Sequence, residues 1–237
     1  MRIALTLLIG VHGIIHLFGF LKAFGIAEFN AISQPISKPV GIAWLLSFLL
    51  FLSAIVLLLI QHHYWWITGI IGVVISQFLI ISYWSDAKFG TIANLIILLG
   101  VILAYSSFSF KNKIKAERAR LFESSQHISQ NIVTEEMISD LPPIVQTWLT
   151  NSGAIGTPLT SNVYLKQDLQ LKMKPEQSKW NSAIAEQYFT VQPPAFNWSI
   201  ATQMSAFLSI VGRDKFENGK GKMLIKLCSL IPVADSK

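Results

Sequence analysis

The pattern of apolar and polar positions changes near residue 110. The first part of the chain contains long, almost uninterrupted apolar runs, whereas later segments alternate between apolar and polar residues. A helix that crosses a bilayer needs about 20 predominantly apolar residues. Four runs approach or reach that length, and they predict membrane-spanning helices over residues 3–21, 40–60, 64–84 and 90–108.

Short helices and then strands are expected after the apolar runs. In "TEEMISDLPPIVQTWLTNSG" a double proline marks a helix start, and Gly153 marks a stop. In "NVYLKQDLQLKM" the period changes to two, which is typical of a strand with one buried face. The apolar positions on that face are Val163, Leu165, Leu169, Leu171 and Met173.

Turn residues connect the later strands. The segments "AEQYFTV" and "AFNWSIA" flank Pro193 and Pro194, and Asn218-Gly219 is a strong hairpin signal. Since no long helices separate these strands, the pattern favours a mainly antiparallel sheet over a parallel βαβ domain. No further element is predicted after the last hairpin to cover the apolar face, so we expect the β domain to be incomplete.

The predicted fold is therefore an α-helical membrane bundle of four transmembrane helices followed by a mainly antiparallel β domain. We expect an anchor over residues 1–110, a basic amphipathic connector over 111–133, and the β domain with its short helices over 134–237. The connector could lie along anionic headgroups, or its charges could serve only to orient the last helix. Its apolar side is formed by Ile114, Leu121, Phe122 and Ile128.

Composition and charge agree with a membrane protein and predict its orientation. The mean hydropathy of +0.49 is too high for an ordinary soluble domain. Lys and Arg near membrane ends favour the cytoplasmic side. With the N-terminus inside, the inner side collects six such residues and the outer side three, so we expect both termini in the cytoplasm and the chain in the cytoplasmic (inner) membrane. The inner residues are Arg2, Lys111, Lys113, Lys115, Arg118 and Arg120, and the outer ones are Lys22, Lys38 and Lys88.

Polar side chains inside the apolar runs are the first candidate site. Histidines four residues apart share one face of a helix, and ionisable groups in spans usually face the bundle interior. This cluster could serve as packing between helices, or as a proton, quinone or metal site. Zinc needs three or four ligands and the spans supply no cysteine or carboxylate to complete a set, so no metal site is predicted. The candidate residues are His12, His16, Ser76, Gln77 and Asn94.

The second candidate is Gln167, which interrupts the apolar face of the first strand. We expect its amide to bond to the backbone within the sheet, and the functional alternative is a polar contact to a bound ligand. Elsewhere the chain carries no G-x-S-x-G motif, and "GRDKFENGKGK" lacks the spacing of a phosphate loop. Cys228 is the lone cysteine and forms no intrachain disulfide. No catalytic residue and no cofactor are predicted.

Three stretches, "LPPIVQTWLTNSG", "QYFTVQPPAFNWS" and "GRDKFENGKGKM", resemble an uncharacterised bacterial family of domains of unknown function. The resemblance covers residues 141–235 and implies a domain that follows a multi-helix membrane anchor. Members of that family usually continue with more strands, so the resemblance implies that this copy is truncated. It implies no activity and no catalytic residues.

These observations favour a non-enzymatic module, tethered to the lipid bilayer, that binds a hydrophobic or lipid-like ligand or a partner protein on the apolar face of its sheet. The alternative is a small membrane redox or transport protein that uses the His, Gln and Asn cluster. The basic residues of the last hairpin alternate with acidic and apolar ones, so nucleic acid is not an expected partner.

Overall fold

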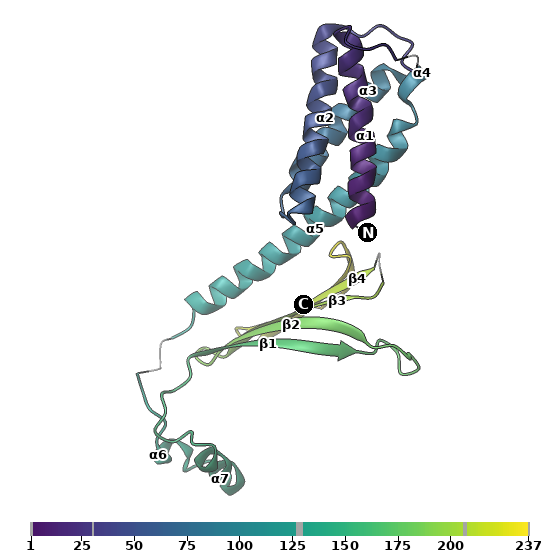
Figure 1. Cartoon of the computed structure of the whole chain (residues 1–237). Coiled ribbons are helices and arrows are strands. Elements are labelled where there is room, and N and C mark those ends of the chain that lie inside the picture. Colours follow the sequence, from purple (N-terminus) through teal and green to yellow (C-terminus); the bar gives the residue numbers. More distant parts are fainter. Residues whose placement is uncertain (1, 30, 127–129, 206–207, 237) are drawn as a thin grey trace. The chain divides into compact units, whose positions relative to one another are not determined.

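The computed structural model describes residues 2–29, 31–126, 130–205 and 208–236. The chain divides into two compact units, Met1–Ser109 and Phe110–Lys237. The first unit is helical and the second holds the strands (Figure 1). This order confirms the predicted class of a four-helix bundle followed by an antiparallel β domain.

Four helices in the first part of the chain are long and apolar enough to cross a membrane. Their positions agree with the four predicted apolar runs, except that the last helix continues without a break well beyond residue 108. A short helix precedes it. The helices are α1 (Arg2–Ala23), α2 (Lys38–Leu59), α3 (Trp65–Ser82), α4 (Trp84–Ala87) and α5 (Gly90–Glu123).

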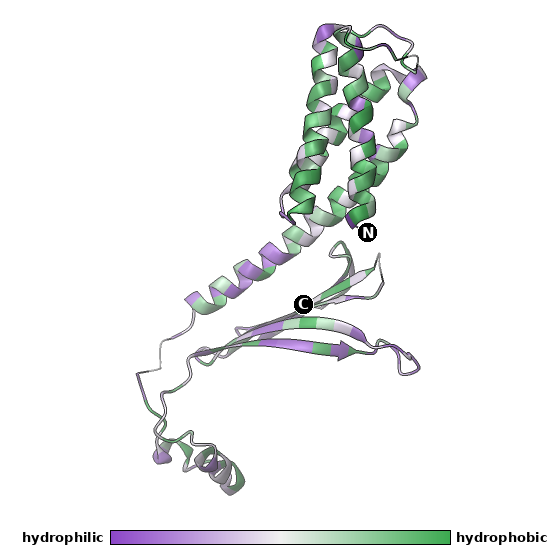
Figure 2. Cartoon of the chain, in the orientation of Figure 1, coloured by the Kyte–Doolittle hydropathy of each residue, from purple (hydrophilic) through white to green (hydrophobic). Residues whose placement is uncertain are grey.

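The bundle buries polar side chains of its helices and exposes many of its aliphatic ones. On α1, His12 and His16 are buried, whereas Ile3 is 75% exposed and Leu7 64% exposed. Apolar colour covers most of α1 and α2 along their length (Figure 2). An exposed aliphatic surface of this extent suits lipid rather than water, because lipid tails are as apolar as these side chains.

Aromatic side chains pack where glycine allows a close approach between helices. The Trp44 ring of α2 lies directly over Gly19 of α1, and a Cβ built at Gly19 would stand 2.2 Å from the Trp44 ring. Phe51, about two turns further along α2, is completely buried and packs with Ile9 and Ile97. The interior of the bundle is therefore aromatic and aliphatic around the polar side chains.

Two loops meet at one end of the bundle. Asp86 of α4 accepts hydrogen bonds from the Ser33 hydroxyl at 2.8 Å and from the Ser33 amide at 2.7 Å. The Gln34 side chain adds a bond to Ser85 at 2.8 Å. These bonds tie the loop between α1 and α2 to the segment between α3 and α5, as expected when four helices alternate in direction.

The β domain is a six-stranded antiparallel meander in which each strand pairs with the next. Asn218 and Gly219 both adopt positive φ, 53° and 73°, which is the two-residue hairpin turn that the sequence predicts. β6 is not predicted by the sequence, and it extends the edge of the sheet. The strands are β1 (Asn162–Leu171), β2 (Asn181–Thr190), β3 (Ala195–Gln203), β4 (Ser209–Glu217), β5 (Lys220–Leu227) and β6 (Ile231–Ser236).

One face of this sheet is polar and receives the end of α5. Residues in register across neighbouring strands share a face, and Glu186, Ser199, Arg213 and Leu224 are in register. Within the described chain, the side-chain hydrogen bonds and ion pairs between α5 and the sheet reach this face. We call it the helix-facing side. They run from Glu117 and Arg118 to Glu186, Asn197, Ser199, Arg213 and Lys215.

The other face is apolar, and we call it the open face. Rows in register cross it, such as Gln167, Ala185, Ile200, Gly212 and Ile225. Most of its large side chains are half-buried, against their own neighbours. The apolar members are Val163, Leu165, Leu169, Leu171, Ala183, Ala185, Phe189, Phe196, Trp198, Ile200, Ile210, Phe216, Met223, Ile225 and Leu227.

The segment expected as a connector is helical at its start. Phe110, Ile114 and Leu121 of α5 are buried, and the first two pack against Leu224 of the sheet. Ile128, which the sequence places on the same apolar side, lies outside the described residues. The helices α6 (Glu135–Ile138) and α7 (Pro143–Asn151) follow, and Gly153 ends α7 with a φ of 73°.

Candidate functional site

His12 lies at the centre of a polar cluster that joins three helices. Its Nε2 is 2.9 Å from Asn94 Oδ1 of α5 and 3.1 Å from Ser76 Oγ of α3. The Asn94 oxygen only accepts, so the short contact requires His12 Nε2 to carry a proton. The imidazole is thereby fixed in one tautomer.

Asn94 extends the cluster to Gln77 and Thr91. Its Nδ2 donates to Gln77 Oε1 at 3.0 Å, and Gln77 Nε2 donates to Thr91 Oγ1 at 3.1 Å. Ser76 Oγ also donates to Asn94 Oδ1, at 3.1 Å. The structure thus brings together His12, Ser76, Gln77 and Asn94, all of which sequence reasoning singled out. It adds Thr91. This residue could have been identified in the sequence because it lies three positions before Asn94, on the same side of the helix.

His16 lies beside this cluster without bonding to its side chains. Its Nδ1 is 2.9 Å from the His12 carbonyl oxygen, one turn earlier on α1. Since a carbonyl oxygen accepts but never donates, Nδ1 carries the proton, and Nε2 of the neutral ring presents a lone pair. Only 1% of the residue is exposed, and Nε2 has no hydrogen-bond partner among the described residues. A hydrogen-bond acceptor that is buried without a donor costs free energy. His16 Nε2 would therefore be stabilised by a donor from outside the described residues.

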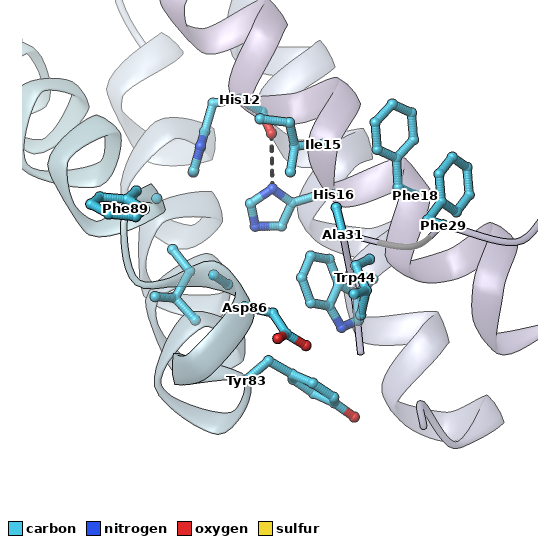
Figure 3. A pocket seen from close by; sticks show the side chains of 14 residues that line it. His12, Ile15, His16, Phe18, Phe29, Ala31, Trp44, Tyr83, Asp86 and Phe89 are labelled. Carbon is cyan, nitrogen blue, oxygen red and sulfur yellow. Dashed lines mark hydrogen bonds between the residues drawn. The ribbon is translucent and has the colours of Figure 1, made fainter. Parts of the chain in front are cut away.

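A cavity of about 210 Å³ lies against His16. Figure 3 shows the ring bonded on one edge to the His12 carbonyl, with Phe89 and Asp86 beyond its other edge and Trp44 beside it. The Trp44 and His16 rings are 5.2 Å apart between centroids. Trp44 Nε1 is a second buried polar atom without a partner among the described residues. The residues that line the cavity therefore include one with a free acceptor, His16, and one with a free donor, Trp44.

Asp86 lines the same cavity, but hydrogen bonds hold its carboxylate at the loops. The Ser33 hydroxyl is the main cause that lowers the pKa of Asp86 below its ordinary value of 3.8, and the Ser33 and Gln34 amides add to it. Among the described residues, no three His, Cys, Asp or Glu side chains lie close enough to hold a metal ion. The lining of the cavity is mostly apolar, and His16 Nε2 and Trp44 Nε1 are the atoms of its lining residues that are buried without a partner among the described residues.

Gln167 belongs to the open face of the sheet. The sequence predicts a backbone partner for its amide, and the structure corrects this: Gln167 Oε1 accepts from the indole Nε1 of Trp198 at 3.1 Å. Strand register explains the change, because Gln167 pairs with Ala185 and Trp198 with the nearby Gln187 on the same face. A long indole reaches diagonally across the small alanine. Gln167 therefore orients Trp198 within the open face.

The described strands lie within a region that matches a family model. Residues 139–237 match a family of unknown function, DUF6920. The match confirms the resemblance of this region to a domain of unknown function. No curated protein and no solved structure matches the chain. The DUF6920 region contains the six strands and α7, whereas the polar cluster and the cavity lie in the part of the chain that precedes it.

Proposed function

We propose that this is a multi-pass membrane protein whose β domain binds the acyl chain of a lipid-like ligand on the open face, without catalysing a reaction. The observation that supports the proposal is which face of the sheet the end of α5 covers. The end of α5 packs through charged and polar contacts on the helix-facing side, which leaves the apolar side chains of the open face to another partner.

The side chains of the open face suit a flexible hydrocarbon chain. Small residues such as Ala185 and Gly212 alternate in register with Ile200 and Ile225, so the surface is uneven. Burying apolar area contributes about 25 cal/mol per Å². The bond between Trp198 and Gln167 pairs these two polar groups with each other, so the apolar side chains around them can contact a hydrocarbon chain without either group losing its partner.

A lipid is the ligand class that the anchor favours. Four candidate membrane helices precede the domain in the same chain, so bilayer lipids are its most abundant apolar neighbours. A partner protein is the competing occupant, and the experiment below separates the two.

The test is site-resolved crosslinking. The full chain in lipid nanodiscs is labelled with a palmitic acid that carries a photoactivated diazirine, and the labelled residues are mapped by mass spectrometry. We expect label on β1 and β3 at open-face positions such as Leu169 and Ile200, and competition by unlabelled palmitate. Label confined to the membrane helices would contradict the proposal.

Two variants on neighbouring positions of β1 provide the matched control. Leu169→Asp places a charge on the open face and should remove most label from the strands, because a charged group in an apolar contact is costly. Asp168→Leu changes the opposite face, where Asp168 is in register with Ile184, and should leave the labelling unchanged. Circular dichroism of both variants establishes that the sheet is retained.

We further propose that both termini lie in the cytoplasm and that the protein resides in the cytoplasmic membrane. The six-to-three distribution of Lys and Arg supports this orientation. A reporter that is active only outside the cytoplasm should be active when fused into the loop 24–37 and silent when fused after Phe110. The opposite result would place the β domain outside.

The polar cluster supports a second candidate function, a small redox or transport protein. The specific observation is the unpartnered Nε2 of His16 at a cavity wall. A metal or haem absorption band that copurifies with the wild-type protein and disappears in His16→Leu would favour this function over lipid binding by the sheet.

A further inference from the structure

The cavity beside His16 has the size of one substituted aromatic ring. A dry apolar cavity of about 150 Å³ accommodates benzene. The volume here, about 210 Å³, leaves room for small substituents on such a ring. Its wall is largely aromatic, with Trp44, Tyr83, Phe18 and Phe29 among the lining residues. Aromatic walls favour an aromatic ligand through stacked and edge-to-face contacts.

The two unpartnered atoms specify the polar group of the ligand. His16 Nε2 presents a lone pair because Nδ1 donates to the His12 carbonyl. The indole Nε1 of Trp44 can only donate. A ring hydroxyl can donate its hydrogen to His16 Nε2, and a hydroxyl oxygen of the ligand can accept from Trp44 Nε1. A carbonyl group offers no hydrogen to His16, so it would leave that acceptor unbonded.

The surroundings of the cavity indicate where the ligand comes from. Ile15 and Phe89 line it and are also exposed on the bundle, by 48% and 73%. These apolar side chains belong to a surface that suits lipid, so a ligand dissolved in the bilayer can reach the cavity past them. On the other side, the loop residues Ala31 and Ile32 close the wall.

We propose that this cavity binds the head group of a lipid-soluble quinol, with a ring hydroxyl that donates a hydrogen bond to His16 Nε2. The site lies in the helical unit and does not depend on the ligand proposed for the sheet. It selects the reduced quinol over the oxidised quinone, because only the quinol supplies the hydrogen that His16 accepts. The polar cluster around His12 holds the helix that carries His16 in place.

The experiment measures binding of three matched ring compounds to the full chain in lipid nanodiscs by calorimetry, with empty nanodiscs as the blank. The probes are trimethylhydroquinone, its dimethyl ether and trimethylbenzoquinone, under argon. We expect saturable binding of the hydroquinone, about tenfold or more tighter than that of the other two, since one buried hydrogen bond is at stake. Equal affinity for the three compounds would show that only apolar partition occurs and would overturn the proposal.

Variants locate the binding in this cavity. His16→Phe keeps a ring of similar shape but removes the acceptor, and it should weaken hydroquinone binding about tenfold. Ala87→Leu adds a larger side chain at the wall and so reduces the volume of the cavity, while His16 and Trp44 stay unchanged. It should abolish binding of all three probes. Ser47→Ala removes a buried hydroxyl outside the lining and should bind as the wild type does. Unchanged binding in both His16→Phe and Ala87→Leu would overturn the site, and if His16→Phe fails to fold, Ala87→Leu and the probe series decide.

Discussion

Glu117 on α5 and Arg213 on β4 form a buried ion pair, with Oε2 and Nε 3.2 Å apart and side chains only 7% and 6% exposed. Asn197 Nδ2 donates to the same carboxylate oxygen at 3.1 Å, and Arg213 Nη1 donates to the Lys222 carbonyl at 3.0 Å. Charges removed from water are stable only when such partners surround them. The end of α5 is therefore fixed to the sheet by a polar network as well as by Phe110 and Ile114.

Removing the carboxylate should release that network. Glu117→Ala leaves Arg213 buried without its acidic partner, and breaking a buried pair in this way costs about 3–5 kcal/mol. The free energy of unfolding is measured on the full chain in mild detergent, from the urea dependence of trypsin cleavage in the β4–β5 hairpin. Glu123→Ala, at the exposed end of the same helix, is the control and should change stability by less than about 0.5 kcal/mol. Equal effects would mean that the buried pair does not hold the helix on the sheet.

The alternation of Leu165 and Leu169 with polar neighbours predicts strand β1 and the two faces of the sheet. It could not predict which face α5 covers, because the helix uses Glu117 and Arg118 and so meets the polar side. Apolar patterning points to burial, whereas a buried charge is recognised only when its partner is known. Arg213 comes from a distant strand, and nothing in its local sequence separates it from an exposed arginine.

The polar cluster shows the same limit inside the bundle. His12, Gln77 and Asn94 could be identified because polar side chains within apolar spans need partners. The absence of a side-chain partner for His16 among the described residues could not be predicted, since it depends on helix rotation and on a hydrogen bond to the backbone carbonyl of His12. The same holds for Gln167, whose partner is set by the diagonal reach of Trp198 across Ala185.

The contact between Gly19 and Trp44 should tolerate no added methyl group. A Cβ at Gly19 would stand 2.2 Å from the indole, and overpacking of this kind costs about 1–3 kcal/mol. Gly19→Ala should therefore lower the thermal stability of the chain in detergent. Gly10→Ala on the same helix is the matched control, because its Cβ would lie 3.6 Å from Ile55, an ordinary contact. Alanine is the better helix former, so Gly10→Ala should be neutral or stabilise by up to about 1 kcal/mol. Identical melting of the two variants would contradict the close packing.

Asn94 should contribute more to the bundle than His16 does. Asn94→Leu removes its bonds to His12, Ser76 and Gln77, and interhelical hydrogen bonds of this kind average about 0.6 kcal/mol each, or about 2 kcal/mol together. His16→Leu removes one bond within α1 and should cost less. Unfolding of the purified protein by sodium dodecyl sulfate, followed by circular dichroism, gives the comparison. A larger loss for His16→Leu would show that the cluster is not the main polar link between the helices.

Acid should release the loop between α1 and α2. Hydrogen bonds from Ser33 lower the pKa of Asp86 below 3.8, so the ionised carboxylate is bound more tightly by the folded loops than by solvent. The contribution is fully present above the ordinary pKa and is lost as the pH falls through the lowered one. Amide exchange of Ser33 and Gln34, corrected for intrinsic rates, should thus be constant between about pH 7 and pH 5 and should accelerate below about pH 4. Asp86→Asn should weaken protection at every pH and remove the transition, because its side chain does not titrate in this range. A transition that persists in Asp86→Asn would assign the acid sensitivity of the loop to another group.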